Sequence, residues 1–198
     1  MDISERLAQQ IRFIVEIDRL KTICRRTLLV DRSRLENSAE HSWHMAVMAV
    51  LLHEYAADRG VDVLRVVKMA LVHDIVEIDA GDTYCYDQAA HADKADREQR
   101  AAERLFGLLP EDQGRELREL WDEFEAMATP AARFAAALDR LQPLLNNYHT
   151  GGVQWQKHGV TADRVMGRMA PMRAGSETLW EYAVGVIRRA VEEGKLEG

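Results

Sequence analysis

Polar side chains that could bind a metal ion stand at the end of an apolar stretch of the sequence. His73 and Asp74 follow a run of apolar residues that ends at Val72. Burying an imidazole and a carboxylate is costly unless a partner satisfies them. That partner is either the other member of the pair, in a core His–Asp ion pair, or a divalent cation. From the dipeptide alone, the ion pair is the more common arrangement.

Two further residues of the same kind favour the cation. Asp139 stands in an Ala-rich helical segment that allows close packing. His41 begins a helical segment that we expect to face a core through Met45, Val47, Met48, Val50 and Leu51. Two imidazoles and two carboxylates form a mixed nitrogen and oxygen donor set. Such a set is typical of sites for manganese, iron, cobalt or magnesium and differs from the thiolate ligands of a structural zinc site.

The elements that must position these residues are helices. Apolar residues recur at helical spacing in two stripes, Leu7, Ile11, Ile14 and Val15, and Trp43, Val47, Val50 and Leu51. No segment shows the alternation of a strand. Two polar stretches, 27–37 and 78–90, are expected to be functional loops. We predict an all-α fold with helices over about residues 4–24, 38–58, 62–78, 92–108, 111–127, 130–148, 161–170 and 175–194.

Composition and charge narrow the class of protein. The chain has 198 residues, 47% of them hydrophobic, and a formal net charge of −7. These values are typical of a globular domain, and the acidic balance argues against a nucleic-acid polymer as partner. No apolar run approaches the roughly 20 residues of a membrane span, and no secretion signal is visible. With two unpaired cysteines, we expect a cytoplasmic protein that binds no membrane and takes a small anionic substrate.

The order of the candidate ligands carries a family resemblance. Four residues resemble the H…HD…D signature of the HD-domain metal-dependent phosphohydrolases: His41, His73, Asp74 and Asp139. Residues 36–42 (ENSAEHS) and 73–82 (HDIVEIDAGD) are similar to segments of the bacterial 5'-deoxynucleotidases of that superfamily. The resemblance covers about residues 5–150. It implies a helical bundle with a central metal site, in which residues 1–198 form one HD domain and helices at about 161–194 pack on the motif-bearing part.

The resemblance also implies a metal-dependent phosphomonoesterase that acts on (deoxy)nucleoside 5'-monophosphates. Its single divalent ion, which the sequence does not distinguish among manganese, cobalt, iron, magnesium, nickel and zinc, would polarise a phosphoryl oxygen and activate water. Glu77 would act as general acid/base, or else be an ordinary surface acid. Arg25 would hold the phosphate through its planar guanidinium. Asp82 would reach the sugar, presented by a tight turn at Gly81. The four signature residues would hold the ion: His41, His73, Asp74 and Asp139.

One position departs from the deoxynucleotidase pattern. Where those enzymes carry a tryptophan after the phosphate arginine, this chain has Arg26, which we assign to the substrate site. Selectivity for deoxyribose is therefore not implied. Farther along, residues 142–159 look like a variant of less characterised members of the superfamily. There Lys157 and His158 would add positive charge around a phosphate, or the segment would be a loop packed by Trp155.

Other metal sites fit the sequence less well. A di-iron carboxylate bundle needs Glu-x-x-His on two helices, and no glutamate here has a histidine three positions on. His53 and Glu54 lack the second histidine of a zincin, because Ala57 stands in its place. Two-metal members of the superfamily use extra histidines before the last aspartate, where this chain has His91 alone, so we expect one ion. The guanosine tetraphosphate hydrolases carry an acid where this chain has Ile78.

A metal-stabilised nucleotide-sensing or regulatory domain without turnover is the alternative from a different class. Glu77, Arg25 and Asp82 argue against it, because a structural metal site needs neither a base nor an anion clamp. The family resemblance and the content of methionine and tryptophan are compatible with a homodimer, but the sequence does not fix the oligomeric state. The sequence does not fix the base, the sugar or the physiological metal.

Overall fold

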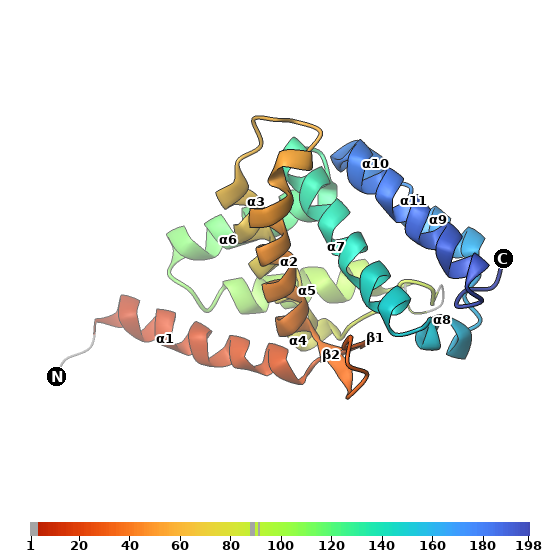
Figure 1. Ribbon diagram of the computed structural model, residues 1–198. Helices are drawn as coiled ribbons and strands as arrows, with labels where there is room; N and C mark the ends of the chain where they lie inside the picture. The colour runs from red at the N-terminus through yellow and green to blue at the C-terminus, as the bar shows by residue number, and fades with distance from the viewer. Residues whose placement is uncertain (1–3, 88–89, 91) are drawn as a thin grey trace.

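A computed structural model describes residues 4–87, 90 and 92–198 of the chain. Helices dominate it, as predicted, and a small hairpin is the one sheet of the described part (Figure 1). Two short helices, Val153–Lys157 and Met172–Gly175, were not predicted, and a third, Glu77–Ala80, extends into the stretch 78–90 that was expected to be a loop. The elements in order are α1 (Glu5–Ile17), η1 (Asp18–Thr22), β1 (Cys24–Leu28), β2 (Leu35–Asn37), α2 (Ser38–Leu52), η2 (His53–Tyr55), α3 (Val63–Val72), α4 (Glu77–Ala80), α5 (Lys94–Phe106), α6 (Glu111–Ala126), α7 (Pro130–His149), α8 (Val153–Lys157), α9 (Ala162–Met169), α10 (Met172–Gly175) and α11 (Glu177–Glu192).

Local capping fixes where the helices that carry the candidate ligands begin. Asn37 and Glu40 form a capping box at the start of α2, so His41 lies in the first turn of that helix. Thr129 caps α7 through its side chain, and Pro130 occupies the first turn, where a missing N–H costs nothing. α7 is the central helix and packs against α2, α3, α6, α10 and α11.

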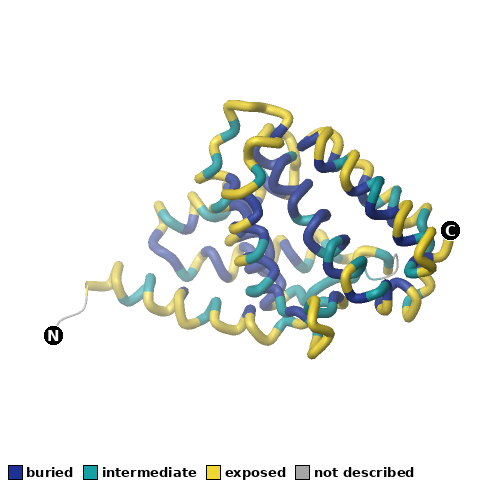
Figure 2. Tube along the Cα trace, in the orientation of Figure 1, coloured by how far each residue is buried: buried dark blue, intermediate teal, exposed yellow. Residues whose placement is uncertain are grey.

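The buried apolar residues form two cores, and Figure 2 shows the buried stretches running along the inner helices. The larger core surrounds α7, whose alanines and leucines are buried against α2, α3 and the C-terminal helices. The smaller core joins η1 to α5 and α6 and takes in Val72, Ile75 and Val76. Met69 and Ala70 belong to the larger core. The chain therefore passes from one core to the other in the last turn of α3, immediately before His73 and Asp74.

The expectation of a loop over residues 27–37 and of no strands was wrong. β1 and β2 pair antiparallel, with Cys24 opposite Asn37 and Leu28 opposite Leu35. Burial does alternate along β1, but one of its inward positions is occupied by Arg25. Because that residue is charged, the sequence shows no apolar alternation from which a strand could be predicted. The helix predicted for residues 62–78 also ends earlier, at Val72, because turns follow before α4.

The two apolar stripes found in the sequence lie on helices but face solvent. Met45 and Met48 are buried as expected, whereas Val47, Val50 and Leu51 are not. The stripe on α2, hereafter the α2 stripe, is 64%, 38%, 55% and 65% exposed at Trp43, Val47, Val50 and Leu51. The stripe on α1 is similarly exposed, at Leu7, Ile11, Ile14 and Val15. None of the described helices combines the length and apolarity needed to cross a membrane.

Candidate metal and phosphate site

Three of the four predicted metal ligands converge at the centre of the bundle. His41 comes from α2, His73 from the end of α3 and Asp139 from α7, and one ligand atom of each lies within 4.8 Å of the others. Asp139 Oδ1 is 3.1 Å from His41 Nε2 and 3.9 Å from His73 Nε2. Both histidines are buried. The arrangement is compact enough for the three side chains to bind one ion.

His73 supplies an observation that fits a bound cation. Its Nδ1 donates to the carbonyl of Ala70 at 2.9 Å, and burial lowers the pKa of the imidazole, which is therefore neutral. Nε2 then carries a lone pair. It is buried without a hydrogen-bond partner among the described residues and faces the carboxylates of Asp74 and Asp139, at 3.1 and 3.9 Å. A lone pair facing carboxylate oxygens calls for a cation between them.

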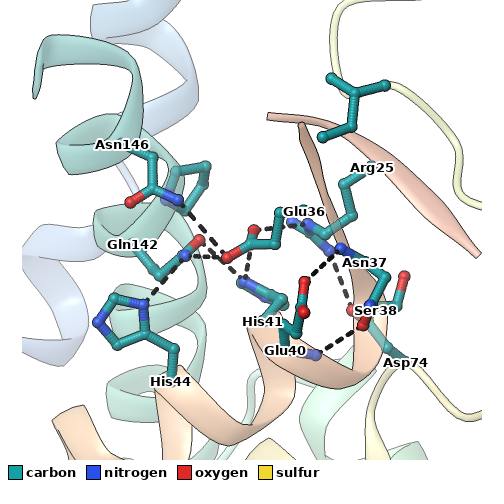
Figure 3. A network of polar contacts seen from close by, with 12 residues as sticks. Arg25, Glu36, Asn37, Ser38, Glu40, His41, His44, Asp74, Gln142 and Asn146 are labelled. Atoms are coloured by element: carbon teal, nitrogen blue, oxygen red, sulfur yellow. Dashed lines mark hydrogen bonds and ion pairs between the residues drawn. The ribbon is translucent and has the colours of Figure 1, made fainter. Parts of the chain in front are cut away.

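His41 is held in the same protonation state by a chain of polar contacts (Figure 3). Gln142 donates from Nε2 to Glu36 at 2.6 Å, which turns the amide oxygen toward His41 Nδ1 at 3.0 Å. Because that oxygen only accepts, Nδ1 carries the proton and Nε2 points its lone pair at Asp139. Burial, and then the charge of Arg25, lower the pKa of His41 to about 4. The imidazole is neutral, as a metal ligand must be.

Glu36 and Gln142 have structural roles that the sequence pattern did not reveal. Glu36 is 2% exposed, and burial raises the pKa of its carboxyl to about 7 although Arg25 and Gln142 oppose the shift. Gln142 is fully buried three residues after Asp139 on α7. That spacing puts both side chains on one face of the helix, which is the signal by which the amide could have been found.

Asp74 lies beside the three-residue cluster and links it to the predicted phosphate arginine. Its Oδ1 is near His73, and its Oδ2 accepts a hydrogen bond from Arg25 Nη1 at 2.9 Å. Arg25 Nε is also 3.7 Å from Glu36 Oε2. Burial raises the pKa of Asp74 to about 8, against the opposing charge of Arg25. The hairpin thus sets both Arg25 and Glu36 against the cluster.

A cavity of about 210 Å³ opens beside these residues. All of the predicted substrate and acid/base residues line it: Arg25, Arg26, Glu77 and Asp82. Glu77 is buried at the start of α4, where Ser38 Oγ donates to its Oε2 at 2.6 Å. Gly81 follows with φ +77°, as expected for the turn before Asp82. Of the four predicted metal ligands, His73, Asp74 and Asp139 line the cavity, whereas His41 does not.

Other cavity residues were missed, and some expected ones lie elsewhere. Lys94, Arg140 and Arg168 bring further positive charge to the lining. Lys157 and His158 do not line it. Trp155 is 2% exposed, and the segment 142–159 is packed as expected in the alternative, but as the end of α7 and the short helix α8 and not as a loop. His91 is outside the described residues. The expectation of a single ion depended on this residue, because it is the one histidine between Asp74 and Asp139.

A family model and several known proteins match most of the chain. A family model described as an HD domain matches residues 17–180. The 5'-deoxynucleotidase HDDC2 of Homo sapiens is 36% identical over 112 residues, which are 57% of this chain and 53% of the human protein. The HDDC2 protein of Mus musculus is 34% identical over 137 residues, 68% of this chain and 66% of the mouse protein. The chain therefore matches about half of the length of its human relative.

Solved structures share the fold. A crystal structure from Magnetospirillum magnetotacticum MS-1, described as a predicted metal-dependent phosphohydrolase, has a TM-score of 0.94 and 56% sequence identity, covering 98% of this chain and 96% of that one. The PH0347 protein of Pyrococcus horikoshii OT3 has a TM-score of 0.65 at 22% identity, covering 91% of this chain and 99% of that one. At that lower identity the likeness concerns the fold alone.

Replacing Asp139 with Asn should remove the bound metal, because an amide is a neutral and weaker ligand for a hard cation. Metal content after dialysis is the measurement, with Asp122→Asn on the exposed side of α6 as control. We also expect added Mn²⁺ to raise the Tm of the unaltered protein but not that of His41→Ala or His73→Ala. Stoichiometric metal in Asp139→Asn would show that this carboxylate is not a ligand.

Proposed function

The chain belongs to the HD-domain family, and from that membership we propose that it is a metal-dependent phosphomonoesterase acting on nucleoside and deoxynucleoside 5'-monophosphates. One observation carries the proposal: a cation-binding cluster, a largely buried arginine and a buried carboxyl group meet in one cavity. The names of its relatives, a 5'-deoxynucleotidase and a predicted metal-dependent phosphohydrolase, support the same reaction class.

The cavity residues have complementary tasks in phosphate ester hydrolysis. His41, His73, Asp74 and Asp139 would hold a divalent ion, which when bound polarises a phosphoryl oxygen and lowers the pKa of water. Arg25, oriented by Asp74 at 2.9 Å, would bind phosphate oxygens. Asp82 would accept a hydrogen bond from the sugar. As water attacks phosphorus and the bond from phosphorus to the ester oxygen breaks, Glu77 would take a proton from the attacking water or give one to the leaving oxygen.

We also propose manganese or cobalt as the ion and a cytoplasmic location. The mixed imidazole and carboxylate donors suit those ions. Cys24 and Cys85 are both free and exposed, as thiols are in a reducing compartment. Residues 1–198 would form a single domain, because α9 and α11 pack on α7, the helix that carries Asp139.

Phosphate release from a panel of nucleoside 5'-monophosphates, with added Mn²⁺ or Co²⁺, tests the proposed activity. We expect Glu77→Gln to lower turnover by roughly 100-fold or more while it leaves metal content intact, because a general acid/base is lost. Glu116→Gln, an exposed acid on α6, is the matched control. No release from any substrate by the unaltered protein would favour the nucleotide-sensing domain. Unchanged turnover in Glu77→Gln would make that residue a bystander.

Sugar selectivity is the second property to test. Arg26 is exposed on β1 and lines the cavity, and its charge acts on the Asp82 carboxyl. An aromatic wall at this position would bury a 2'-hydroxyl without a partner, which costs about 1 to 3 kcal/mol. Arginine can donate to that hydroxyl instead. We therefore expect similar kcat/KM for ribo and deoxyribo substrates, and a deoxy preference in Arg26→Trp of roughly 5-fold to 100-fold.

Arg26→Gln separates the added ring from the lost charge in that comparison. Only the tryptophan variant should gain the full preference if the wall excludes the hydroxyl. A strong deoxy preference in the unaltered protein, unchanged by Arg26→Trp, would show that position 26 does not read the sugar.

We propose a homodimer in which the α2 stripe is part of the interface. Its four apolar side chains are spaced on one helical face yet 38% to 65% exposed, and contiguous exposed apolar surface marks interaction sites. Sedimentation should give a dimer for the unaltered protein and a shift toward monomer for Trp43→Glu. Val153→Glu, which adds the same charge at a 41% exposed position on α8, should stay dimeric. A monomeric unaltered protein would contradict the proposal.

A further inference from the structure

The cavity lining holds a second group of positive charge besides Arg25. Arg140 follows Asp139 on α7, and Arg168 comes from α9; both line the cavity. Asp139 divides its two oxygens between two kinds of neighbour. Oδ1 faces the histidines, and Oδ2 lies 3.5 Å from Arg168 Nη2 and 4.0 Å from Arg140 Nη1. A single carboxylate oxygen therefore lies within ion-pair distance of two guanidinium groups.

Arg140 is buried with only a distant carboxylate, Asp139 Oδ2 at 4.0 Å from Nη1, and with no bidentate partner among the described residues. The residue is 7% exposed. Nη1 donates to the Ala136 carbonyl at 2.7 Å, and Nη2 has only the weakly accepting Sδ of Met127, at 3.8 Å. Nε has no hydrogen-bond partner among the described residues. Buried arginines are usually satisfied by bidentate carboxylate or phosphate contacts, because an unpaired buried charge is costly.

The same division of oxygens occurs at Asp74, and this indicates what the arginine pair binds. Asp74 has one oxygen near His73 and the other on Arg25. Arg25 and the arginine pair thus approach the histidine and carboxylate cluster through the outer oxygens of two different aspartates. A phosphate monoester has three non-bridging oxygens in a tetrahedral arrangement, so donors on one side cannot reach all of them. Arg25 is already shared between Asp74 and Glu36, whereas Arg140 has donors to spare.

We propose that Arg140 and Arg168 form a second anion subsite, which binds a non-bridging oxygen of the substrate phosphoryl group from the Asp139 side while Arg25 binds from the Asp74 side. This inference rests on the proposed phosphatase function. It assigns substrate binding to two residues outside the family signature, and it accounts for the buried guanidinium of Arg140.

Titration of the Mn²⁺-loaded protein with inorganic phosphate, followed by calorimetry, tests the subsite. We expect Arg140→Met and Arg168→Met each to raise the Kd of phosphate about 10-fold or more, as for the loss of hydrogen bonds to a charged group. Metal content should stay unchanged. Arg173→Met is the control, because Arg173 is a 67% exposed side chain paired with Glu177. If Arg140→Met does not fold, Arg168→Met carries the test, since its wild-type side chain is 34% exposed.

The outcomes distinguish a phosphate subsite from an arginine pair that only positions Asp139. A raised KM for monophosphates and a weaker competitive inhibition by phosphate, in parallel with the raised Kd, support the subsite. Unchanged phosphate affinity in both variants overturns it. Loss of metal, with unchanged phosphate affinity once metal is restored, also overturns it, because the arginines would then act on the carboxylate alone. If the unaltered protein binds phosphate through both arginines but hydrolyses no substrate, the subsite stands and the proposed phosphatase function fails.

Discussion

Two neutral imidazoles and a carboxylate meet at the centre of this bundle with no proton to share among them. Ala70 and Gln142 accept the one proton of each ring, so both Nε2 lone pairs face Asp139. Burying such groups is costly unless a partner satisfies them, and a cation between them would do so. The convergence of α2, the end of α3 and α7 brings these groups together. The two cores, both of which include residues of the last turn of α3, hold that convergence in place.

The small hairpin extends this constraint from the ion to its surroundings. Its inward residues, Arg25 and Glu36, are charged, and they would be costly to bury anywhere but beside Asp74 and Gln142. The hairpin is therefore held by polar contacts with the cluster as much as by its ladder. Glu36 of the hairpin also orients the side-chain amide of Gln142, whose oxygen fixes the tautomer of His41 (Figure 3). The candidate metal ligands and the arginine proposed to bind phosphate are thus parts of one connected polar network.

The helices, and the candidate ligands that the structure brings together, could be predicted from sequence because they leave local signals. Apolar periodicity and caps mark the helices, and charged residues in apolar runs mark His73, Asp74 and Asp139. The hairpin left no such signal, since Arg25 occupies an inward position. Periodicity also could not tell which apolar face is buried, so the α2 stripe was assigned to the core although it is exposed. Gln142 was missed because an amide in a helix is ordinary until its neighbours are known.

Aromatic side chains of the cavity lining come from other elements than the position after Arg25 that the family pattern indicates. Tyr84 and Tyr86 line the cavity, with ring centroids 5.4 Å apart, and Arg26 lies close enough for its charge to act on Tyr84. Position 26 therefore lacks a ring, but the cavity does not. An apolar wall for a nucleoside can be provided by the loop after Asp82, which leaves the Arg26 guanidinium free to meet a sugar hydroxyl. Because both tyrosines stay in place when position 26 changes, a change in sugar preference there measures the local contact and not the loss of the whole wall.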